Sequence, residues 1–350
     1  MKKVLVAMSG GVDSSVAALL IQKMGYDPIG MTLRLSASED TLSTGTQAEQ
    51  DAAAVCAYLQ IPFISADYRE QFRKIVIDYF ISAYERGETP NPCVICNRYV
   101  KFDCMLREAD QLGADSIATG HYARVEFDGA SGRYLLKRGM DISKDQSYML
   151  YNLTQEQLSR ILFPLGEMQK SEIRKIAAEH SFRSADKPDS QDICFVPDGD
   201  YAAFIERNSG KIYPPGSFTD RHGHVLGMHK GFIRYTIGQR KGLGLALPAP
   251  MYVCAKNAET NTVVLGSNAD LMTDSCTAAA VNWVSIARPS APVRAEVKVR
   301  YSQKGAAAVV YPLDNGRVRV EFDLPQRAVT RGQAAVFYDG DVVLGGGCIE

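Results

Sequence analysis

A glycine-rich segment near the start of the chain could hold phosphate. Residues 9–15 (SGGVDSS) follow an apolar run and precede an apolar-periodic stretch, an order that predicts a strand, a tight turn and a helix. The two glycines let the backbone approach an anion closely because they carry no Cβ atom. Free N–H groups at the start of the predicted helix, together with its dipole, favour negative charge in the turn. The segment therefore predicts a phosphate-binding loop.

The loop differs from two common nucleotide-binding loops. A Walker-type loop carries a lysine before its last serine or threonine, whereas Asp13 stands before Ser14 here. The glycines are adjacent, not spaced as in dinucleotide-binding folds. The pattern S-G-G-x-D-S resembles the pyrophosphate loop of the ATP-pyrophosphatase superfamily, which implies adenylation of a substrate with release of pyrophosphate. A glycine-rich turn without a ligand is the alternative interpretation.

Two further segments carry cysteines that could act as nucleophiles. Residues 89–98 (TPNPCVICNR) contain Cys93 and Cys96, and residues 186–195 (DKPDSQDICF) contain Cys194. The prolines and Asx residues of both segments predict loops. We expect a loop cysteine beside Arg98 and near a helix N-terminus to have a lowered pKa and to react as a thiolate.

The C-x-x-C pair is compatible with more than one chemistry. The sequence offers no second ligand pair at zinc-site spacing, which argues against tetrahedral zinc. An iron–sulfur site with Cys93, Cys96 and Cys194 as ligands is an alternative. Four other cysteines lie in helix-like or strand-like runs and are expected to pack as small apolar residues: Cys56, Cys254, Cys276 and Cys348.

The elements predicted for the first 200 residues would bring the loop to the edge of a parallel sheet. Strand-like and helix-like runs alternate, in the order 4–7, 14–24, 27–35, 49–59, 62–65, 70–85, 99–112 and 116–120. This alternation indicates βαβ units. Ligands of such sheets bind beyond the carboxyl ends of the strands, where the loop and Gly120 fall. The Ser/Thr/Gly-rich stretch 36–47 predicts either a mobile loop beside the nucleotide or a plain surface insertion.

The rest of the chain changes to a β-rich pattern. Short strands are predicted at 251–255 and 262–265, and residues 293–301 alternate between apolar and charged side chains. Turn signals at 314–316 and 339–340 separate further alternating runs, which predicts a small barrel or sandwich. We expect an α/β domain over 1–203, a small central β-rich domain over 204–273 and a C-terminal β-barrel over 274–350.

Composition sets broad limits on the function. The chain has 350 residues, of which 46% are hydrophobic and 23% charged, as in ordinary globular proteins. Its net charge of −1 does not exclude nucleic-acid binding, because a neutral protein can carry a local basic face. No apolar run reaches the roughly 18 residues of a membrane span, and none fits a signal peptide. We expect a cytoplasmic monomer with reduced thiols that does not associate with membranes.

Taken together, the motifs resemble the bacterial tRNA-specific 2-thiouridylase family nearly end to end. The segments that carry the resemblance are 7–15, 89–102, 118–122 (ATGHY), 144–148 (KDQSY), 190–195, 235–244 (YTIGQRKGLG), 300–301 and 345–347. The resemblance implies an N-terminal adenine-nucleotide alpha-hydrolase-like sheet and ATP-dependent 2-thiolation of the wobble uridine of tRNA. Uridine O2 would be adenylated, and a persulfide on Cys194 would deliver sulfur to C2. Cys96 would serve as nucleophile or resolving thiol, leaving a transient Cys96–Cys194 disulfide.

The same resemblance implies the residues and partners of the site. ATP, with Mg²⁺ on its phosphates, would contact Ala7, Met8, Ser9, Gly10, Gly11, Val12, Asp13, Ser14, Leu33 and Gly120. The target base and the tRNA would contact Asn91, Pro92, Cys93, His121, Lys144, Asp145, Gln146, Arg300, Tyr301 and Gln333. A persulfide donor or relay protein would supply the sulfur.

Position 93 departs from the family pattern, because many members carry Asp where this chain has Cys93. A thiol does not replace the charge of a carboxylate, so base contact, metal ligation and a spare resolving thiol stay open for this residue. Another adenylating enzyme of the superfamily, or a non-catalytic RNA-binding or iron–sulfur sensing protein, are alternatives for the whole chain.

Basic residues in the C-terminal half could neutralise tRNA phosphates. Residues 229–241 contain no acid, and a second group has Glu296 as its single nearby acid. That second group consists of Arg288, Arg294, Lys298, Arg300 and Lys304.

Overall fold

A computed structural model describes residues 1–35, 46–183 and 193–350 of the chain. All but the last two residues of the stretch 36–47 lie outside these ranges, and so do residues 186–192 of the segment that leads to Cys194.

The N-terminal part is a five-stranded sheet in which every pairing is parallel, in the order β3-β2-β1-β4-β7. The central strand β1 (Lys3–Ala7) points Val4 and Val6 toward one face and Leu5 toward the other. Helices cover both faces, which explains why this strand is continuously apolar and not alternating. The strands are β1, β2 (Asp27–Arg34), β3 (Phe63–Asp67), β4 (Ser116–Ala118) and β7 (Ile161–Leu162).

Helices from both ends of this part cover the sheet. Apolar side chains of α1 (Val12–Lys23), α2 (Gln47–Leu59) and α8 (Lys170–Glu179) share a core with Val4 and Val6, whereas α6 (Asp103–Leu112) packs on the face of Leu5. The predicted α/β fold is confirmed. The remaining helices here are α3 (Arg69–Phe72), α4 (Asp78–Glu85), α5 (Pro92–Cys96), α7 (Gln155–Ser159), α9 (Tyr201–Ser209), the π-helices η1 (Arg73–Ile77) and η2 (Asn97–Phe102), and the 3₁₀-helix η3 (Ser147–Met149).

The loop predicted around Cys93 and Cys96 is wrong, because both residues lie on helix α5. Asn91 caps this helix, its Oδ1 accepting a hydrogen bond from the Cys93 N–H at 3.2 Å, and Pro92 occupies the first helical position. Both residue types favour turns, but they also favour helix N-termini, where the missing N–H of proline costs nothing. From there α5, η2 and α6 continue without a break to Leu112.

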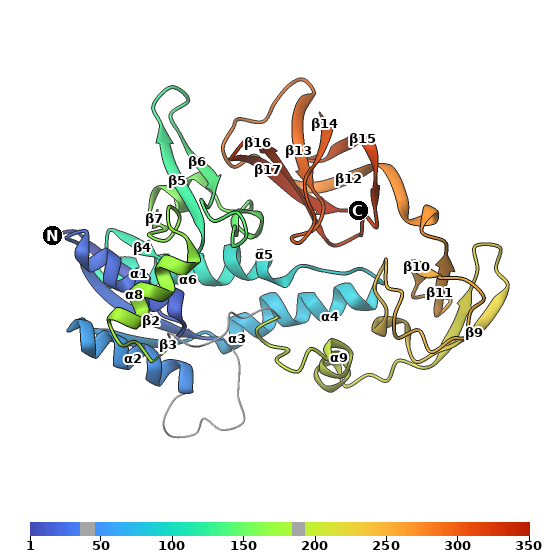
Figure 1. The fold of residues 1–350 in the computed structure, drawn as a ribbon, viewed down its shortest axis with the longest axis horizontal. Coiled ribbons are helices and arrows are strands. Elements are labelled where there is room, and N and C mark those ends of the chain that lie inside the picture. Colours follow the sequence, from blue (N-terminus) through green and yellow to red (C-terminus); the bar gives the residue numbers. More distant parts are fainter. Residues whose placement is uncertain (36–45, 184–192) are drawn as a thin grey trace.

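The C-terminal half contains a small sheet and a closed barrel (Figure 1). The small sheet has the order β10-β11-β8-β9, and the barrel runs from β12 through β15, β14, β13, β16 and β17 back to β12. The predicted barrel is thus confirmed, whereas the hairpin β5–β6, whose strand β6 pairs with β17, was not predicted. These elements are β5 (Ala123–Asp128), β6 (Arg133–Arg138), β8 (Gly216–Thr219), β9 (Val225–His229), η4 (Phe232–Arg234), β10 (Tyr252–Asn257), β11 (Thr262–Gly266), η5 (Ala269–Leu271), β12 (Met272–Asn282), β13 (Val293–Lys298), β14 (Ala306–Pro312), β15 (Val318–Arg327), β16 (Ala334–Asp339) and β17 (Val342–Ile349).

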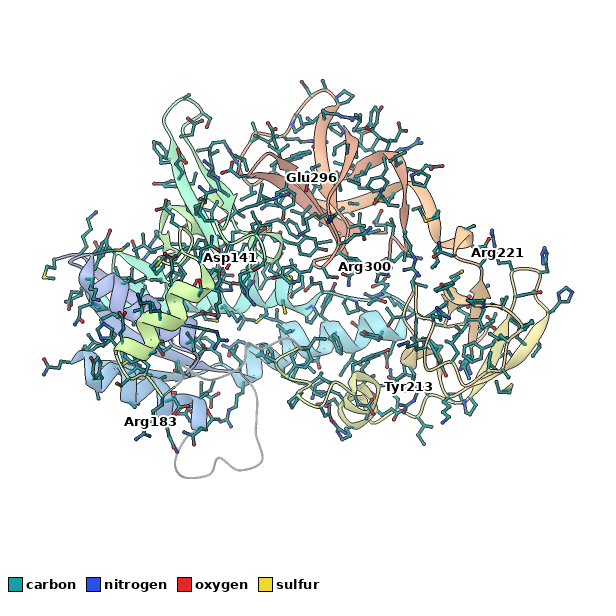
Figure 2. The ribbon with its side chains drawn as sticks, in the orientation of Figure 1. Asp141, Arg183, Tyr213, Arg221, Glu296 and Arg300 are labelled. Carbon is teal, nitrogen blue, oxygen red and sulfur yellow. The ribbon has the colours of Figure 1, made fainter. Side chains whose placement is uncertain are left out.

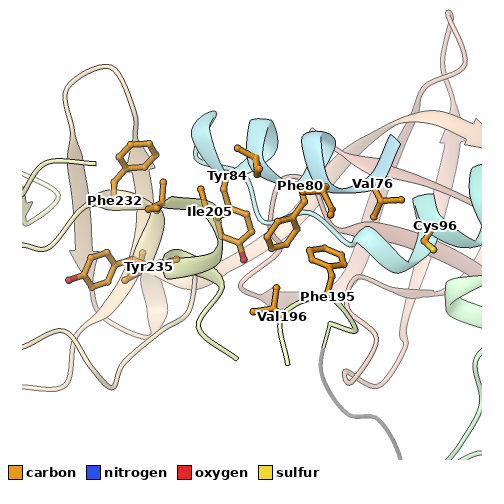
Figure 3. Close-up of a cluster of buried hydrophobic side chains, with 14 of the residues drawn as sticks. Val76, Phe80, Tyr84, Cys96, Phe195, Val196, Ile205, Phe232 and Tyr235 are labelled. Atoms are coloured by element: carbon orange, nitrogen blue, oxygen red, sulfur yellow. The ribbon is translucent and has the colours of Figure 1, made fainter. Parts of the chain in front are cut away.

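One apolar core joins the N-terminal part to the small sheet (Figure 3). Phe80 and Tyr84 of α4 belong to it together with Phe218 of β8 and Val253 of β10. We propose domain boundaries near residues 203 and 273, the first of which falls within α9. Of the helices in the described residues, none is long and apolar enough to cross a membrane.

Candidate functional site

The glycine-rich loop lies at the carboxyl end of β1, where the strand order of the sheet reverses between β1 and β4. This is the position at which open α/β sheets bind ligands. Gly11 is the N-cap of α1 and provides no side-chain cap, which leaves the first N–H groups of the helix for an anion. Gly10 has φ +70°, and a Cβ atom there would lie 2.3 Å from the carbonyl oxygen of Ala48.

Serine hydroxyls hold the loop in shape. Ser9 donates to the Ser14 Oγ through both its N–H and its hydroxyl, each at 3.1 Å, and Ser14 donates to the Gly11 carbonyl at 3.1 Å. The residues predicted to contact ATP all lie at this edge of the sheet: Ala7 to Ser14 run from the end of β1 into α1, Leu33 is on β2, and Gly120 follows β4.

Asp13 of the loop is held by two residues that the sequence analysis did not single out. The Lys170 Nζ lies 2.7 and 2.8 Å from the two carboxylate oxygens of Asp13, and the Tyr122 hydroxyl donates to one of them at 2.7 Å. Lys170 opens α8, and its side chain is only 10% exposed. The cation that a Walker loop would carry in its own sequence is thus supplied from a distant helix. Nothing in the sequence around Lys170 signals this pairing.

Cys96 and Cys194 lie in a second part of the site, in the same domain as the glycine-rich loop. Cys96 is 4% exposed and shares a core with Phe195, whose ring packs edge-on against Phe72 and Phe80 at centroid distances of 5.6 and 5.3 Å (Figure 3). Because Phe195 is anchored there, the exposed Cys194 is fixed at the border of the core that contains Cys96.

The expected lowering of the cysteine pKa values is wrong for this structure. Burial raises the pKa of Cys96 to about 12 and also raises that of Cys93, while the ammonium of Lys101 opposes both shifts. Arg98, which was expected to lower them, instead donates to the side-chain oxygen of Asn152. Desolvation disfavours a thiolate more than one ammonium favours it here.

Lys101 was also missed by the sequence analysis. Burial lowers its pKa, but the facing thiols of Cys96, Cys194 and Cys93 outweigh this and raise it. A lysine five residues after Cys96 carries no recognisable signal unless the intervening turn is known to be a π-helix.

His121 lies between the two halves of the site. Its Nδ1 is 2.7 Å from the Thr119 hydroxyl, and its ring packs against Phe102 at 5.7 Å. Burial, together with the charge of Lys101, lowers its pKa to about 3, so the imidazole is neutral at physiological pH. The preceding residue, Gly120, touches the loop: a Cβ atom there would lie 2.8 Å from the Asp13 carbonyl carbon.

Two residues predicted to contact the base or the tRNA, Asp145 and Gln146, accept hydrogen bonds from backbone N–H groups of neighbouring segments. Asp145 is buried and accepts from the N–H groups of Gly139 and Ser147 at 3.2 and 3.0 Å. Gln146 accepts from the Tyr122 N–H at 3.0 Å, next to the half-buried Lys144.

Asn91 and Gln333 tie segments together around Cys93. Asn91 donates to the Met149 sulfur at 3.3 Å, and Gln333 donates to the Thr89 carbonyl at 2.7 Å. The second bond joins the barrel to the start of the segment that carries Cys93, while Pro92 beside it is buried.

Arg300 (labelled in Figure 2) and the next residue, Tyr301, follow β13 of the barrel in the chain. The Arg300 guanidinium donates to the carbonyls of Ile237 and Ala328 and to the Thr330 hydroxyl, so it joins the barrel to the segment before β10. Tyr301 is 39% exposed, and it alone is exposed among the ten residues that the family resemblance implies for the base and the tRNA.

The prediction of a single acid near the basic group on the barrel is wrong. Arg294 is paired with Asp323 of β15, and Glu296 pairs with Arg138 of the hairpin at 2.7 Å. Asp323 reaches Arg294 because β15 lies across β14 from β13, a neighbourhood that only the barrel creates.

Metal binding by the cysteines does not fit this arrangement. Over 1–35, 46–183 and 193–350, no group of three or more His, Cys, Asp or Glu is placed to hold a metal ion. In this part of the chain, Cys93, Cys96 and Cys194 are therefore not grouped as ligands of one metal site. The Asp13 carboxylate, which Lys170 and Tyr122 hold and which is 33% exposed, is the type of group that binds Mg²⁺ together with substrate phosphates.

Comparisons with known proteins cover the whole chain. Family models described as "tRNA methyl transferase HUP domain", "tRNA methyl transferase PRC-barrel domain" and "Aminomethyltransferase beta-barrel domain" match residues 2–198, 202–267 and 273–349. The tRNA-specific 2-thiouridylase MnmA of Acetivibrio thermocellus is 51% identical over 356 residues, which cover 100% of this chain and 99% of the relative.

A second relative agrees with the first, whereas a solved structure that resembles part of the chain is too distant to support an argument. The protein of that name from Clostridioides difficile is 48% identical over 354 residues, covering 100% of this chain and 98% of the relative. A solved structure of a 4-thiouridine synthetase with RNA and bound ATP has a TM-score of 0.36 at 17% identity, covering 59% of this chain and 50% of that chain. This last likeness is too weak to indicate a shared function.

Proposed function

The chain belongs to the tRNA-specific 2-thiouridylase family, and on this premise we propose that it is a tRNA-uridine 2-sulfurtransferase. The enzyme uses ATP to replace O2 of a wobble uridine with sulfur. One observation carries the proposal: Gly120 touches Asp13 of the phosphate loop, while the adjacent His121 faces Lys101 of the cysteine cluster. A base at this junction can reach ATP on one side and thiols on the other.

The phosphate loop supplies the activating half of the reaction. A urea-like carbonyl is a poor electrophile, because the neighbouring nitrogens donate electrons into it. Uridine O2 attacks the α-phosphate of ATP, pyrophosphate leaves, and O2 becomes part of a good leaving group. The N–H groups at the start of α1 and the Lys170 ammonium face negative charge on the phosphates. Asp13 would hold Mg²⁺, which neutralises phosphate charge when bound.

The cysteines supply the sulfur. A persulfide on Cys194, loaded by a protein persulfide donor, attacks C2 through its terminal sulfur, and AMP leaves with O2. The Cys96 thiolate then attacks the Cys194 Sγ, forming a Cys96–Cys194 disulfide and breaking the bond from Cys194 to the transferred sulfur. That bond's electron pair stays on the transferred sulfur, which takes up charge and a proton as 2-thiouridine. A reductant must restore both thiols before the next turnover.

Residues around the junction bind the substrate. We propose that Asn91, Pro92, Cys93 and His121 meet the target base, with His121 acting as a neutral hydrogen-bonding group. Tyr301 offers an exposed ring to the tRNA. The remaining predicted residues shape the contacting segments: Lys144, Asp145, Gln146, Arg300 and Gln333. We propose that the protein acts as a monomer. Because its proposed substrate is tRNA, we also propose that it acts in the cytoplasm.

The test is a modification assay on anticodon stem-loops with a wobble uridine. With ATP, Mg²⁺ and a protein persulfide donor, we expect 2-thiouridine by mass spectrometry, with one pyrophosphate and one AMP released per thiolation. Without the donor, pyrophosphate is expected but no thiolated base, and a stem-loop with a wobble cytidine should give neither. ATP cleavage that depends on ammonia and ignores tRNA would instead identify another adenylating enzyme.

Replacing Gly120 with alanine is expected to weaken ATP binding. The new Cβ atom would meet the backbone of Asp13 at 2.8 to 3.0 Å, so the loop must shift. Overpacking of this kind costs about 1–3 kcal/mol of stability, and we expect ATP affinity to fall about tenfold or more. Isothermal titration with ATP and thermal unfolding measure the two effects. Gly129→Ala is the matched control, because nothing lies within 4 Å of a Cβ atom there.

A further inference from the structure

Lys101 lies on the same helix as two of the site's cysteines. It belongs to η2 (Asn97–Phe102), the π-helical segment that directly follows Cys93 and Cys96 on α5. Backbone hydrogen bonds of a π-helix join residues five apart, and such segments are frequent at functional sites. Lys101 is the fifth residue after Cys96, so the π-turn brings its side chain to the side of the helix that carries that thiol. Its neighbours Val100 and Phe102 are fully buried, which fixes this stretch of helix.

The groups that surround the Lys101 ammonium in the described part of the chain are unusual for a lysine, because they are thiols and not carboxylates. The groups that face it are the thiols of Cys93 and Cys96, from its own helix, and of Cys194, from a segment about a hundred residues further along. Among the described residues, Lys101 makes no hydrogen bond and no ion pair, and no carboxylate faces it. His121, whose ring is neutral, also faces Lys101.

A half-buried ammonium without a carboxylate partner is costly, because it loses hydration without gaining a counter-charge. A negative charge that forms beside it offsets part of this cost. Among the groups of the described residues that face Lys101, only the thiols can provide that charge, since His121 can only become positive. Cys104 of α6, a fourth thiol facing Cys96, is fully buried and is not among the groups that face Lys101.

We propose that Lys101 is the counter-ion of the sulfur-transfer half-reaction, an inference that rests on the proposed function. Its ammonium stabilises the thiolate of Cys96 and the persulfide anion on Cys194 as they form. When Cys96 attacks the Cys194 Sγ, negative charge moves from one sulfur to another within the cluster. The ammonium keeps its protons throughout and forms no bond, so the balance of the step is unchanged.

The first test follows the ionisation of Cys96 without ATP or tRNA. The rate at which a small neutral thiosulfonate modifies Cys96 is measured against pH by peptide mass spectrometry. In Lys101→Met we expect the rate at pH 8 to fall about tenfold or more, with the whole profile moved to higher pH. Lys101→Arg should retain the wild-type profile within about threefold, because it keeps the positive charge. Modification of Cys254 in the same samples is the internal control.

The second test separates the two half-reactions in a single turnover. Lys101→Met should slow the appearance of 2-thiouridine about a hundredfold while pyrophosphate release with tRNA stays within about threefold. Lys74→Met removes an exposed lysine from the other π-helix and should change neither. Lys101→Gln, which keeps a polar side chain, serves if the methionine variant does not fold. If the pH profile of Cys96 modification is the same as in the wild type in both Lys101→Met and Lys101→Gln, the proposal is overturned. Failure of thiolation in the wild type, with the Cys96 profile still dependent on Lys101, would instead count against the proposed function.

Discussion

Replacing Cys194 with serine is expected to abolish 2-thiolation while ATP-dependent pyrophosphate release with tRNA continues. A hydroxyl cannot carry a persulfide, so no sulfur reaches C2, whereas the phosphate loop is untouched. We expect thiolation to fall by about a thousandfold or more, as for loss of other covalent nucleophiles, with pyrophosphate release within about threefold of wild type. Mass spectrometry of digested stem-loops and a pyrophosphate assay measure the two quantities.

Cys96→Ser should stop the reaction one step later. Without the resolving thiol, the adduct that joins Cys194 through two sulfurs to C2 of the base should accumulate as a protein–RNA band on a denaturing gel. A small thiol should cleave that band by the same exchange reaction and release thiolated RNA. Cys254→Ser is the matched control, because Cys254 is a half-buried cysteine of the small sheet, outside the site. Full thiolation by Cys194→Ser with a protein donor would rule out the persulfide role.

Replacing Asp13 with asparagine should have the largest effect on the activating half-reaction. The change removes the charge of a carboxylate that Lys170 holds through both oxygens at 2.7 and 2.8 Å, and so weakens this ion pair. We expect pyrophosphate release to fall about a hundredfold or more, because Asp13 is the residue that we propose to hold Mg²⁺. Breaking a fully buried ion pair lowers the free energy of unfolding by about 3–5 kcal/mol. Because Asp13 is partly exposed, we expect Asp13→Asn to lower it by about 1–3 kcal/mol.

Tyr122→Phe is the control that separates the charge of Asp13 from its hydrogen bonding. It removes the 2.7 Å bond from the tyrosine hydroxyl to Asp13 but keeps both the carboxylate and the ring. We expect a loss of about 1 kcal/mol in stability and less than a tenfold loss in pyrophosphate release. Chemical denaturation and the same pyrophosphate assay measure both variants. If Tyr122→Phe were as inactive as Asp13→Asn, the positioning of the loop and not the carboxylate charge would be limiting.

The parts of this protein that depend on local sequence were predictable. Residues 9–15 and their flanks predicted a strand, a turn and a helix, because adjacent glycines permit a tight turn between an apolar run and an apolar-periodic stretch. Alternation over 293–301 likewise predicted a barrel strand, since side chains along a strand point to opposite faces. In the segment around Cys93, Asn91 and Pro92 suit both turns and helix starts, and the prediction of a loop was wrong.

Electrostatic partners were set by the tertiary structure alone. Lys170 reaches Asp13 across 157 positions, and Lys101 meets Cys194 only after Phe195 is anchored in a core shared with Cys96. The same core raises the pKa of Cys96, although the sequence around it had predicted the opposite. Charge interactions and desolvation depend on distance through space, which an order of residues does not contain. The sequence by itself thus predicted the glycine-rich loop and the fold class and suggested which thiols react, whereas the packing of distant segments decided which cations lie beside these groups and how deeply they are buried.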